Sequence, residues 1–482
     1  MAGMADYEAF DALGLADLVH RREVTPAELL EAAFARVDRL NPKINAVVLE
    51  QRDKALTVAK AGTPKGPFGG VPMLLKDLGS EAIDFPTNSG SRLFAGSTYD
   101  YDSEIYLRIK RAGFITFGRT TSPEFGIGPT TEAQVYGGPT RNPWDLSCST
   151  GGSSGGSGAA VAAGILPAAH GSDGGGSVRI PASNCGLFGL KPTRARLPDG
   201  PASGEGWAGM AIDGFLTRTV RDTAALIDAT HGPDLGAPYW APAVAWPYLE
   251  EIKAAPGRLR IAVSKRTFAG EPVHADCAQA IDHAAKLCAD LGHEIVEAEP
   301  QINILKLMRG WADIVACGTA LTVASQAKVL GRQPRTDELE GVTRGAIEHA
   351  KTVSGADYLA AVSRVHDVGR AMARFLTGYD MLLTPTMSEP PAKIGRFKPD
   401  RTDFVAYRTG ADGVLPYSPF TALFNATGQP AMTVPLHWNA QDLPIGVHFA
   451  ARFGEDAALL KLAAQLEEAA PWFQRRPTFK TS

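Results

Sequence analysis

The chain contains a glycine- and serine-rich segment that reads STGGSSGGSG at residues 149–158, GSDGGGSVRIP at 171–181 and CGLFGLKPT at 185–193. Runs of Gly and Ser are commonly flexible linkers. This run instead abuts a small-residue stretch that we predict to be helical, 159–164, and apolar strands, so it does not join two domains. No GxxxxGK[ST] motif exists, and GxGxxG is not matched at a strand–helix junction. The segment therefore indicates a folded site, and a nucleotide site is disfavoured.

Three glycines, Gly174, Gly175 and Gly176, stand directly before Ser177. Glycine lets the backbone turn so that consecutive N–H groups converge, which gives an oxyanion hole beside a hydroxyl nucleophile. Ser177 needs a base, and the GxSxG nucleophile motif is absent because the segment reads GGGSVR. The nearest histidine, His170, has no acidic partner at an informative spacing. Spacing alone leaves open a triad with a more distant histidine: His231, His283, His349 or His366.

Lys76 is the alternative base, because it ends the apolar segment GVPMLLK. A lysine accepts a proton only when neutral, and lowering its pKa from ~10.4 to near 7 requires desolvation of roughly 4–5 kcal/mol. The preceding apolar residues supply that setting. In an extended strand Asp77 points to the opposite side, so it need not hold Lys76 in its charged form. A lysine that reaches to solvent from a strand end is the other interpretation.

The rest of the chain alternates predicted helices and strands. TPAE at 25–28 is a capping box with proline at the first helical position. Predicted strands lie at 69–76, 114–118, 258–263, 294–297 and 382–386. A predicted helix at about 103–112 lies between the first two of these strands, which indicates a βαβ unit. We therefore predict the α/β class: one large domain over 1–482, with a mixed β-sheet core covered by helices.

This predicted domain divides by sequence character into a catalytic core at 70–230 and an elaborated helical region at about 235–400. The second region is expected to shape the substrate site. The chain has 48 Lys and Arg against 52 Asp and Glu, a net charge of −4, without a block of like charge. Neither nucleic acid nor a membrane is therefore an expected partner.

The cysteines and the N-terminal sequence indicate the cellular compartment of the protein. Five cysteines show neither CxxC nor metal spacing, which argues against a disulfide framework and a metal site. Acidic residues at 6, 8 and 11 interrupt any apolar signal segment. We expect a cytoplasmic protein, monomeric or homodimeric, that acts on a small molecule.

Several separated motifs resemble those of the amidase signature family of serine hydrolases. GGSSGGSGAAVAAG and GSDGGGSVRIPASNCGLFGLKPT match the family's defining block, and 24 residues separate Ser153 from Ser177. GVPMLLKD, TRNPWD, NATGQPAMTVP and LPIGVHFAARFGED stand in family order, so the resemblance covers roughly residues 10–475. It implies a single amidase-signature domain that cleaves amides through an acyl-enzyme, without cofactor or metal.

The resemblance also implies a Ser–cis-Ser–Lys triad. Ser177 is then the nucleophile, Ser153 relays protons from a cis Gly152–Ser153 peptide, and Lys76 is the base. The oxyanion-hole amides are those of Gly174, Gly175, Gly176 and Ser177.

Neighbouring residues are expected to support these groups. Asp173 and Arg179 are expected to pair beneath the nucleophile loop, and Thr150 and Ser172 to hydrogen-bond around the triad. Two segments, 196–215 with Trp207 and Met210, and 396–417, are expected to wall the pocket, and Cys317 is a further candidate for its lining.

Two positions depart from the family pattern. Gly174 stands where a larger apolar residue is common, which predicts a roomier site. His448 replaces a common glutamine, and we interpret it as a neutral hydrogen-bonding substitute rather than a base.

The C-terminal region looks most like bacterial hydrolases of cyclic or oligomeric nylon-type amides and like aryl-acylamidases. The segment SPFT at 418–421 lacks the acidic residue that glutaminase subunits of amidotransferases commonly carry there. A neutral, fairly apolar amide is therefore the expected substrate. The same triad could act as a urethanase or aryl esterase on carbamates or esters, and a glutaminase subunit is the remaining alternative.

Overall fold

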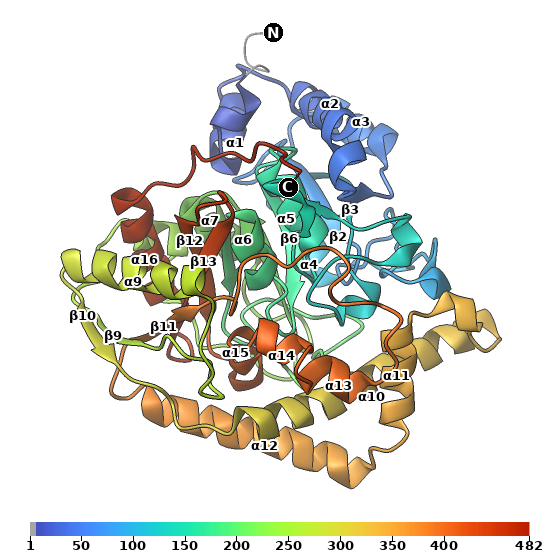
Figure 1. The fold of residues 1–482 in the computed structure, drawn as a ribbon. Helices are drawn as coiled ribbons and strands as arrows, with labels where there is room; N and C mark the ends of the chain where they lie inside the picture. Colours follow the sequence, from blue (N-terminus) through green and yellow to red (C-terminus); the bar gives the residue numbers. More distant parts are fainter. Residues whose placement is uncertain (1–5, 482) are drawn as a thin grey trace.

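Two β-sheets lie beside each other at the centre of the structure, a computed structural model that describes residues 6–481 (Figure 1). The larger sheet has eight strands in the order β10-β9-β11-β13-β12-β7-β8-β6. These are β6 (Ala168–Asp173), β7 (Phe188–Lys191), β8 (Ile212–Thr217), β9 (Arg260–Val263), β10 (Glu294–Glu297), β11 (Met381–Pro385), β12 (Ala431–Trp438) and β13 (Pro444–Ala451). β9 pairs in parallel with β10 and β11, and the other pairs are antiparallel, so the sheet is mixed, as predicted.

The smaller sheet has the order β1-β3-β2. Its strands are β1 (Val47–Val48), β2 (Pro72–Lys76) and β3 (Ile115–Thr120). The parallel β2–β3 pair with α4 (Glu104–Arg111) between them confirms the predicted βαβ unit. The strand that carries Lys76 therefore belongs to a separate sheet, not to the single sheet we predicted. β2 is an edge strand, and it packs against the edge strand β6 of the larger sheet without sharing a ladder with it.

The helices surround the two sheets in three groups, each with its own apolar cluster. The first group is α1 (Ala12–His20), α4, α7 (Val220–Thr230), α8 (Tyr248–Glu251), α9 (Ala275–Asp290) and α16 (Asp456–Ala469). The second is α10 (Ile304–Leu330), α11 (Gly341–Ala350), α12 (Gly355–Phe375), α13 (Phe404–Thr409), α14 (Val414–Tyr417) and α15 (Thr421–Thr427). The third is α2 (Pro26–Ile44), α3 (Arg52–Lys60), α5 (Gly155–Ala162) and α6 (Arg179–Cys185), with α6 also reaching the second cluster. A short ribbon of β4 (Arg141–Asn142) and β5 (Asp145–Ser149) completes the elements.

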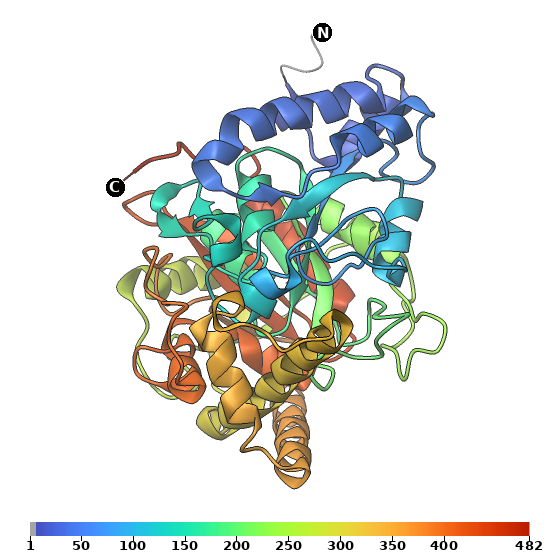
Figure 2. The same cartoon turned by 90° about the vertical axis from the view of Figure 1, so that its right-hand side faces the viewer.

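Apolar side chains of the central strands point alternately to the two faces of the larger sheet, which explains why helices cover both faces. In β11, Met381 and Leu383 belong to the first cluster, whereas Leu382 belongs to the second. Successive strand residues point to opposite faces, so the two clusters lie on opposite sides of the sheet. Figure 2 shows the blue helices α1–α3 at one end of the molecule and the yellow and orange helices α10–α12 at the other.

The region 235–400 is not a separate unit, because it supplies β9, β10 and β11 to the same sheet. Its long helices α10 and α12 pack on each other, and α12 also packs on α15. The capping box predicted at the start of α2 is present, with Thr25 and Glu28 bonded reciprocally. No helix within residues 6–481 combines the length and the apolar character that crossing a bilayer requires.

The smaller sheet depends on its packing against α2. Phe117 of β3 is fully buried, and its ring meets that of Phe34 edge to face at 5.3 Å. We expect Phe117→Ala to lower the free energy of unfolding by about 3–5 kcal/mol, because it leaves a cavity. Leu359→Ala on α12, where the side chain is 67% exposed, should change it by less than about 0.5 kcal/mol. Urea titration followed by circular dichroism measures both, and equal effects would contradict this packing.

Candidate active site

Lys76 ends β2 and points its amine toward the loop after β5. Its Nζ lies 2.6 Å from Ser153 Oγ and 2.9 Å from Ser172 Oγ. The Lys76 amide also donates to His170 Nδ1 at 3.2 Å, which links β2 to the neighbouring edge strand β6. The contact with Ser172 confirms that this residue hydrogen-bonds around the proposed triad. Lys76 belongs to the smaller sheet and is thus held by β6 of the larger sheet and by the loop after β5.

Burial decides the charge of Lys76. The side chain is fully buried, and desolvation lowers its pKa to about 7, although Asp173 and Asp213 act in the opposite direction. A lysine with this pKa is about half neutral at pH 7 and can accept a proton. The alternative of a solvated strand-end lysine is wrong.

Ser153 and Ser177 line one cavity of about 420 Å³. Ser153 follows a cis Gly152–Ser153 peptide, as the resemblance implies. Ser177 stands between β6 and α6 and is 9% exposed, so the cavity gives access to its hydroxyl. The structure therefore places the Lys76 amine in contact with Ser153, and it places Ser153 and Ser177 on the wall of the same cavity.

A buried ion pair supports the loop that carries Ser177. Arg179 Nη2 donates to Asp173 Oδ1 at 2.9 Å and Nε to Oδ2 at 3.0 Å, and both side chains are fully buried. This confirms the predicted pair. Burial alone would raise the pKa of Asp173, but Arg179 and Asn425 outweigh it and hold that pKa below its usual range. The carboxylate is thus ionised and free to accept from the loop.

The amides of the glycine loop divide between two tasks. Gly176 N donates to Asp173 Oδ1 at 2.7 Å, so this amide is engaged and does not face a substrate. That corrects the predicted oxyanion hole. The amides of Gly174, Gly175 and Ser177 make no hydrogen bond with any residue from 6 to 481, and they remain as the candidate donors. Position 176 requires glycine, because its φ is +127° and a Cβ there would lie only 2.3 Å from Thr421 Oγ1.

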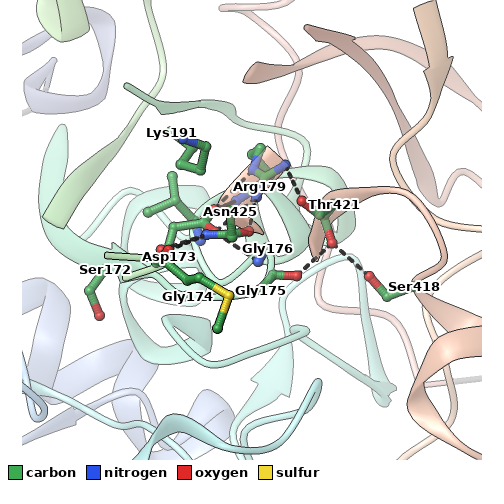
Figure 3. A network of polar contacts seen from close by, with 12 residues as sticks. Ser172, Asp173, Gly174, Gly175, Gly176, Arg179, Lys191, Ser418, Thr421 and Asn425 are labelled. Carbon is green, nitrogen blue, oxygen red and sulfur yellow. Dashed lines mark hydrogen bonds and ion pairs between the residues drawn. The ribbon is translucent and has the colours of Figure 1, made fainter. Parts of the chain in front are cut away.

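Three residues that support this loop were given no role from sequence. Thr421 Oγ1 donates to Gly175 O at 2.7 Å, and Asn425 Nδ2 donates to Asp173 O at 2.8 Å (Figure 3). Trp311 of α10 packs its ring 3.2 Å from the place of a Gly175 Cβ, and its indole donates to Gly174 O at 3.4 Å. Asn425 stands in a motif that we recognised, but nothing in the sequence pointed to Trp311.

The absence of a side chain at Gly174 does not enlarge the site, contrary to our prediction. Trp207 takes the space, because its ring carbons lie 2.6 and 2.8 Å from the place of a Gly174 Cβ. Trp207 also meets Trp311 edge to face at 5.7 Å and lines the cavity, as expected. A glycine is needed here because a larger residue would displace this indole.

Two predicted pocket residues lie elsewhere. Met210 is 1% exposed and packs in the second apolar cluster rather than in the cavity. On α10 the cavity is lined by Thr319 and Thr322, and Cys317 is not among its lining residues. A helix turns about 100° per residue, so Cys317 points some 200° away from Thr319. Residues 396–417 do not line the cavity either; residues 78–105 do so together with 198–213.

The remaining polar candidates have structural contacts. His170 does have an acidic partner, Asp213 on β8, whose Oδ1 lies 3.1 Å from Nε2. Its Nδ1 is occupied by the Lys76 amide, and no histidine of residues 6–481 lines the cavity, so a histidine base is not supported. Thr150 donates to Gly151 O at 3.1 Å and makes no hydrogen bond to the triad, which corrects that prediction.

His448 is neutral, as predicted. Burial first, and then Arg179, lower its pKa well below the usual value. Its Nε2 accepts from Arg179 Nη1 at 3.0 Å, so the ring extends the network beneath the loop that carries Ser177. Within residues 6–481 no group of three or more His, Cys, Asp or Glu is placed to hold a metal ion.

Comparison with known proteins agrees with this geometry. The sequence profile of the family described as Amidase matches residues 28–460. The chain belongs to the amidase signature family. It is 38% identical over 476 residues to the 6-aminohexanoate-cyclic-dimer hydrolase of Paenarthrobacter ureafaciens, covering 97% of this chain and 96% of that protein. It is 34% identical over 475 residues to an acylamidase of Rhodococcus erythropolis, covering 97% and 96%.

Solved structures give the same result. The 6-aminohexanoate cyclic dimer hydrolase complexed with substrate superimposes with a TM-score of 0.92 at 37% identity, covering 98% of this chain and 99% of that one. A bacterial aryl acylamidase superimposes with a TM-score of 0.87 at 27% identity, covering 96% and 97%. This amidase is therefore a hydrolase of amide bonds, built on a single amidase-signature domain.

The contact between Gly174 and Trp207 gives a test of the site's packing. We expect Gly174→Ala to lower kcat/KM of the amidase on an anilide by about 10- to 100-fold, because the indole and the loop must shift. Trp207→Ala added to it should recover part of the loss. Gly355→Ala, where a Cβ meets nothing within 4 Å, is the matched control and should stay near wild type. Full activity of Gly174→Ala would show that the indole does not occupy this space.

Proposed function

We propose that this amidase cleaves small amides through Lys76, Ser153 and Ser177 by way of an acyl-enzyme. The observation that carries the proposal is the 2.6 Å contact between the buried Lys76 amine and Ser153 Oγ, because Ser153 lines the same cavity as Ser177. Neutral Lys76 accepts the proton of Ser153, and Ser153 in turn accepts that of Ser177. Ser177 Oγ then forms a bond to the substrate carbonyl carbon.

The negative charge that develops on the carbonyl oxygen meets the free amides of Gly174, Gly175 and Ser177. When the tetrahedral adduct collapses, the C–N bond breaks and Ser153 returns a proton to the leaving nitrogen. Water then forms a bond to the acyl carbon while Ser153 accepts its proton. The bond from that carbon to Ser177 Oγ breaks, Ser153 returns the proton to Ser177, and the acid is released. The Asp173–Arg179 pair takes no part in proton transfer, and it holds the loop through Gly176 N and Val178 N.

The lining of the cavity supports an uncharged reacting group. Phe94, Phe125 and Trp207 give it aromatic walls, and neither lysine nor arginine from the described residues 6–481 lines it. A substrate that carries a free carboxylate, such as glutamine, would therefore enter without a counter-charge. A small amide, such as the cyclic dimer in the name of one relative, is of the size class that a cavity of about 420 Å³ accommodates. Carbamates and aryl esters offer the same carbonyl chemistry and are the second class to test.

The experiment compares a 4-nitroanilide, a carbamate and an ester of matched shape, with free glutamine as the fourth substrate. Turnover of the anilide by the purified chain alone supports the proposal. Turnover of the carbamate or ester without the anilide would assign the site to urethanase or esterase chemistry. Hydrolysis of glutamine alone would contradict the proposal and favour a glutaminase subunit.

Removal of the nucleophile tests the assignment of the triad. We expect Ser177→Ala to lower kcat by about 10³-fold or more, and Ser153→Ala and Lys76→Ala to cause losses that do not add to it, because the three groups act as one unit. Ser325→Ala, an exposed serine on α10, is the control. Acid quenching during turnover followed by mass spectrometry should place the acyl group on Ser177. An active Ser177→Ala variant with a normal melting temperature would refute the assignment.

The pKa of Lys76 predicts the pH profile. The base acts only in its neutral form, so kcat/KM should rise with pH and level off above about 7, where burial places the pKa of Lys76. Below pH 7, each further decrease of one pH unit should lower kcat/KM about tenfold. Lys191, whose pKa burial also lowers to about 7, serves as the control, because Lys191→Met should leave the inflection in place. A profile that stays flat below pH 7 would exclude Lys76 as the base.

A further inference from the structure

Three carboxyl groups line the catalytic cavity. Glu81 belongs to the loop after β2, Asp199 precedes the Gly200–Pro201 peptide, and Asp213 belongs to β8. Glu81 and Asp199 have no ion-pair partner among residues 6–481, and the one side chain in that range that pairs with Asp213 is His170, whose Nε2 lies 3.1 Å from Asp213 Oδ1. The nearby Arg119 donates to backbone carbonyls, including Pro86 O at 2.7 Å and Lys76 O at 2.9 Å, and not to these carboxylates.

The three groups lie close enough to act on one another. Burial, together with the charges of Asp213 and Glu81, raises the pKa of Asp199 to about 7. Burial and the charge of Asp213 likewise raise the pKa of Glu81. Within residues 6–481 neither lysine nor arginine forms an ion pair with any of the three carboxyl groups, so a positively charged ligand in the cavity would stabilise their charged forms.

A second, independent feature of the same cavity points to a hydrogen-bond donor. Ser80 is 2% exposed and lines the cavity, and its hydroxyl has no hydrogen-bond partner among the described residues. A buried hydroxyl without a partner is costly, and a ligand N–H would satisfy its oxygen.

Aromatic rings complete this part of the wall. Tyr99 and Tyr101 line the cavity and meet edge to face at 5.8 Å. The faces of such rings attract cations. The carboxylates do not converge as metal ligands, since no such group of three is present in residues 6–481. An ammonium group, whose three N–H donors can reach separate acceptors, suits this arrangement better than a metal ion.

We propose that Glu81, Asp199 and Asp213, with Ser80 and the two tyrosines, form a subsite for a protonated amine carried by the substrate. The proposal rests on the proposed function, because it gives the cavity its substrate class: amides that bear an ammonium group apart from the bond that is cleaved. It narrows the expected neutral substrate to one that is uncharged at the reacting carbonyl and cationic at a distance from it.

The test compares substrates that differ only in that charge. On the acyl side, ω-aminoacyl 4-nitroanilides of four, six and eight carbons are paired with alkanoyl anilides in which methyl replaces ammonium. On the amine side, N-(ω-aminoalkyl)benzamides are paired with N-alkylbenzamides. In at least one series the wild-type kcat/KM should favour the ammonium substrate by about tenfold or more, as charge-assisted hydrogen bonds allow.

Variants test which residues cause the preference for the ammonium substrate. Glu81→Gln combined with Asp199→Asn should reduce the ammonium-to-methyl ratio by about tenfold, and Glu81→Lys should shift the preference toward an ω-carboxyacyl anilide. Asp84→Asn is the matched control, because Asp84 is an exposed carboxylate of the same loop that pairs with Lys54 at 2.9 Å. A wild-type ratio near one in both series, or a ratio that Asp84→Asn and the double variant change equally, overturns the subsite.

Calorimetry separates this proposal from the proposed function. The variant Ser177→Ala is titrated with 6-aminohexanamide and with heptanamide, which requires no turnover. Tighter binding of the ammonium compound supports the subsite even if no amide is hydrolysed. Binding without hydrolysis would contradict the proposed function and leave the subsite supported. Equal binding of the two compounds overturns the subsite even if anilides are hydrolysed.

Discussion

The structure depends on one contact, between the amine of Lys76 and the hydroxyl of Ser153, which lies where two sheet edges meet. β2 delivers the lysine, and the loop after β5 delivers the serine. Neither sheet alone would bury the amine, because β2 is the edge of the smaller sheet and β6 the edge of the larger one. Burial at this junction lowers the pKa of Lys76 to about 7, and that makes a lysine usable as a base.

The second requirement is that the loop carrying Ser177 keeps its position. Asp173 and Arg179 hold it from below, and Trp311 packs on it from the helical region 235–400. That region thus adds strands to the sheet and also braces the reactive loop. The amides left without partners are the ones that a developing negative charge can use.

Much of the fold could be predicted from the sequence, because strands and caps are local features: the strand 294–297 and the capping box at Thr25 follow from short patterns. The residues of the site, including the Asp173–Arg179 pair, were instead predicted from the resemblance to the amidase signature family, since the residues alone left the base open between Lys76 and a histidine. The two-sheet arrangement could not be predicted, since strand pairing is not a local property. Trp311 and the orientation of Cys317 were missed for a related reason: a long apolar helix does not reveal which side meets the cavity.

The most direct test of the account is the titration of Lys76 itself. Protein labelled with carbon-13 at the lysine ε position gives one resonance per amine, and Lys76→Met and Lys191→Met identify the two buried ones. We expect the Lys76 resonance to titrate near pH 7, where burial places its pKa. A midpoint near ~10.4, the value of a solvated lysine, would contradict it, because the amine would then be charged at neutral pH and unable to accept the proton of Ser153.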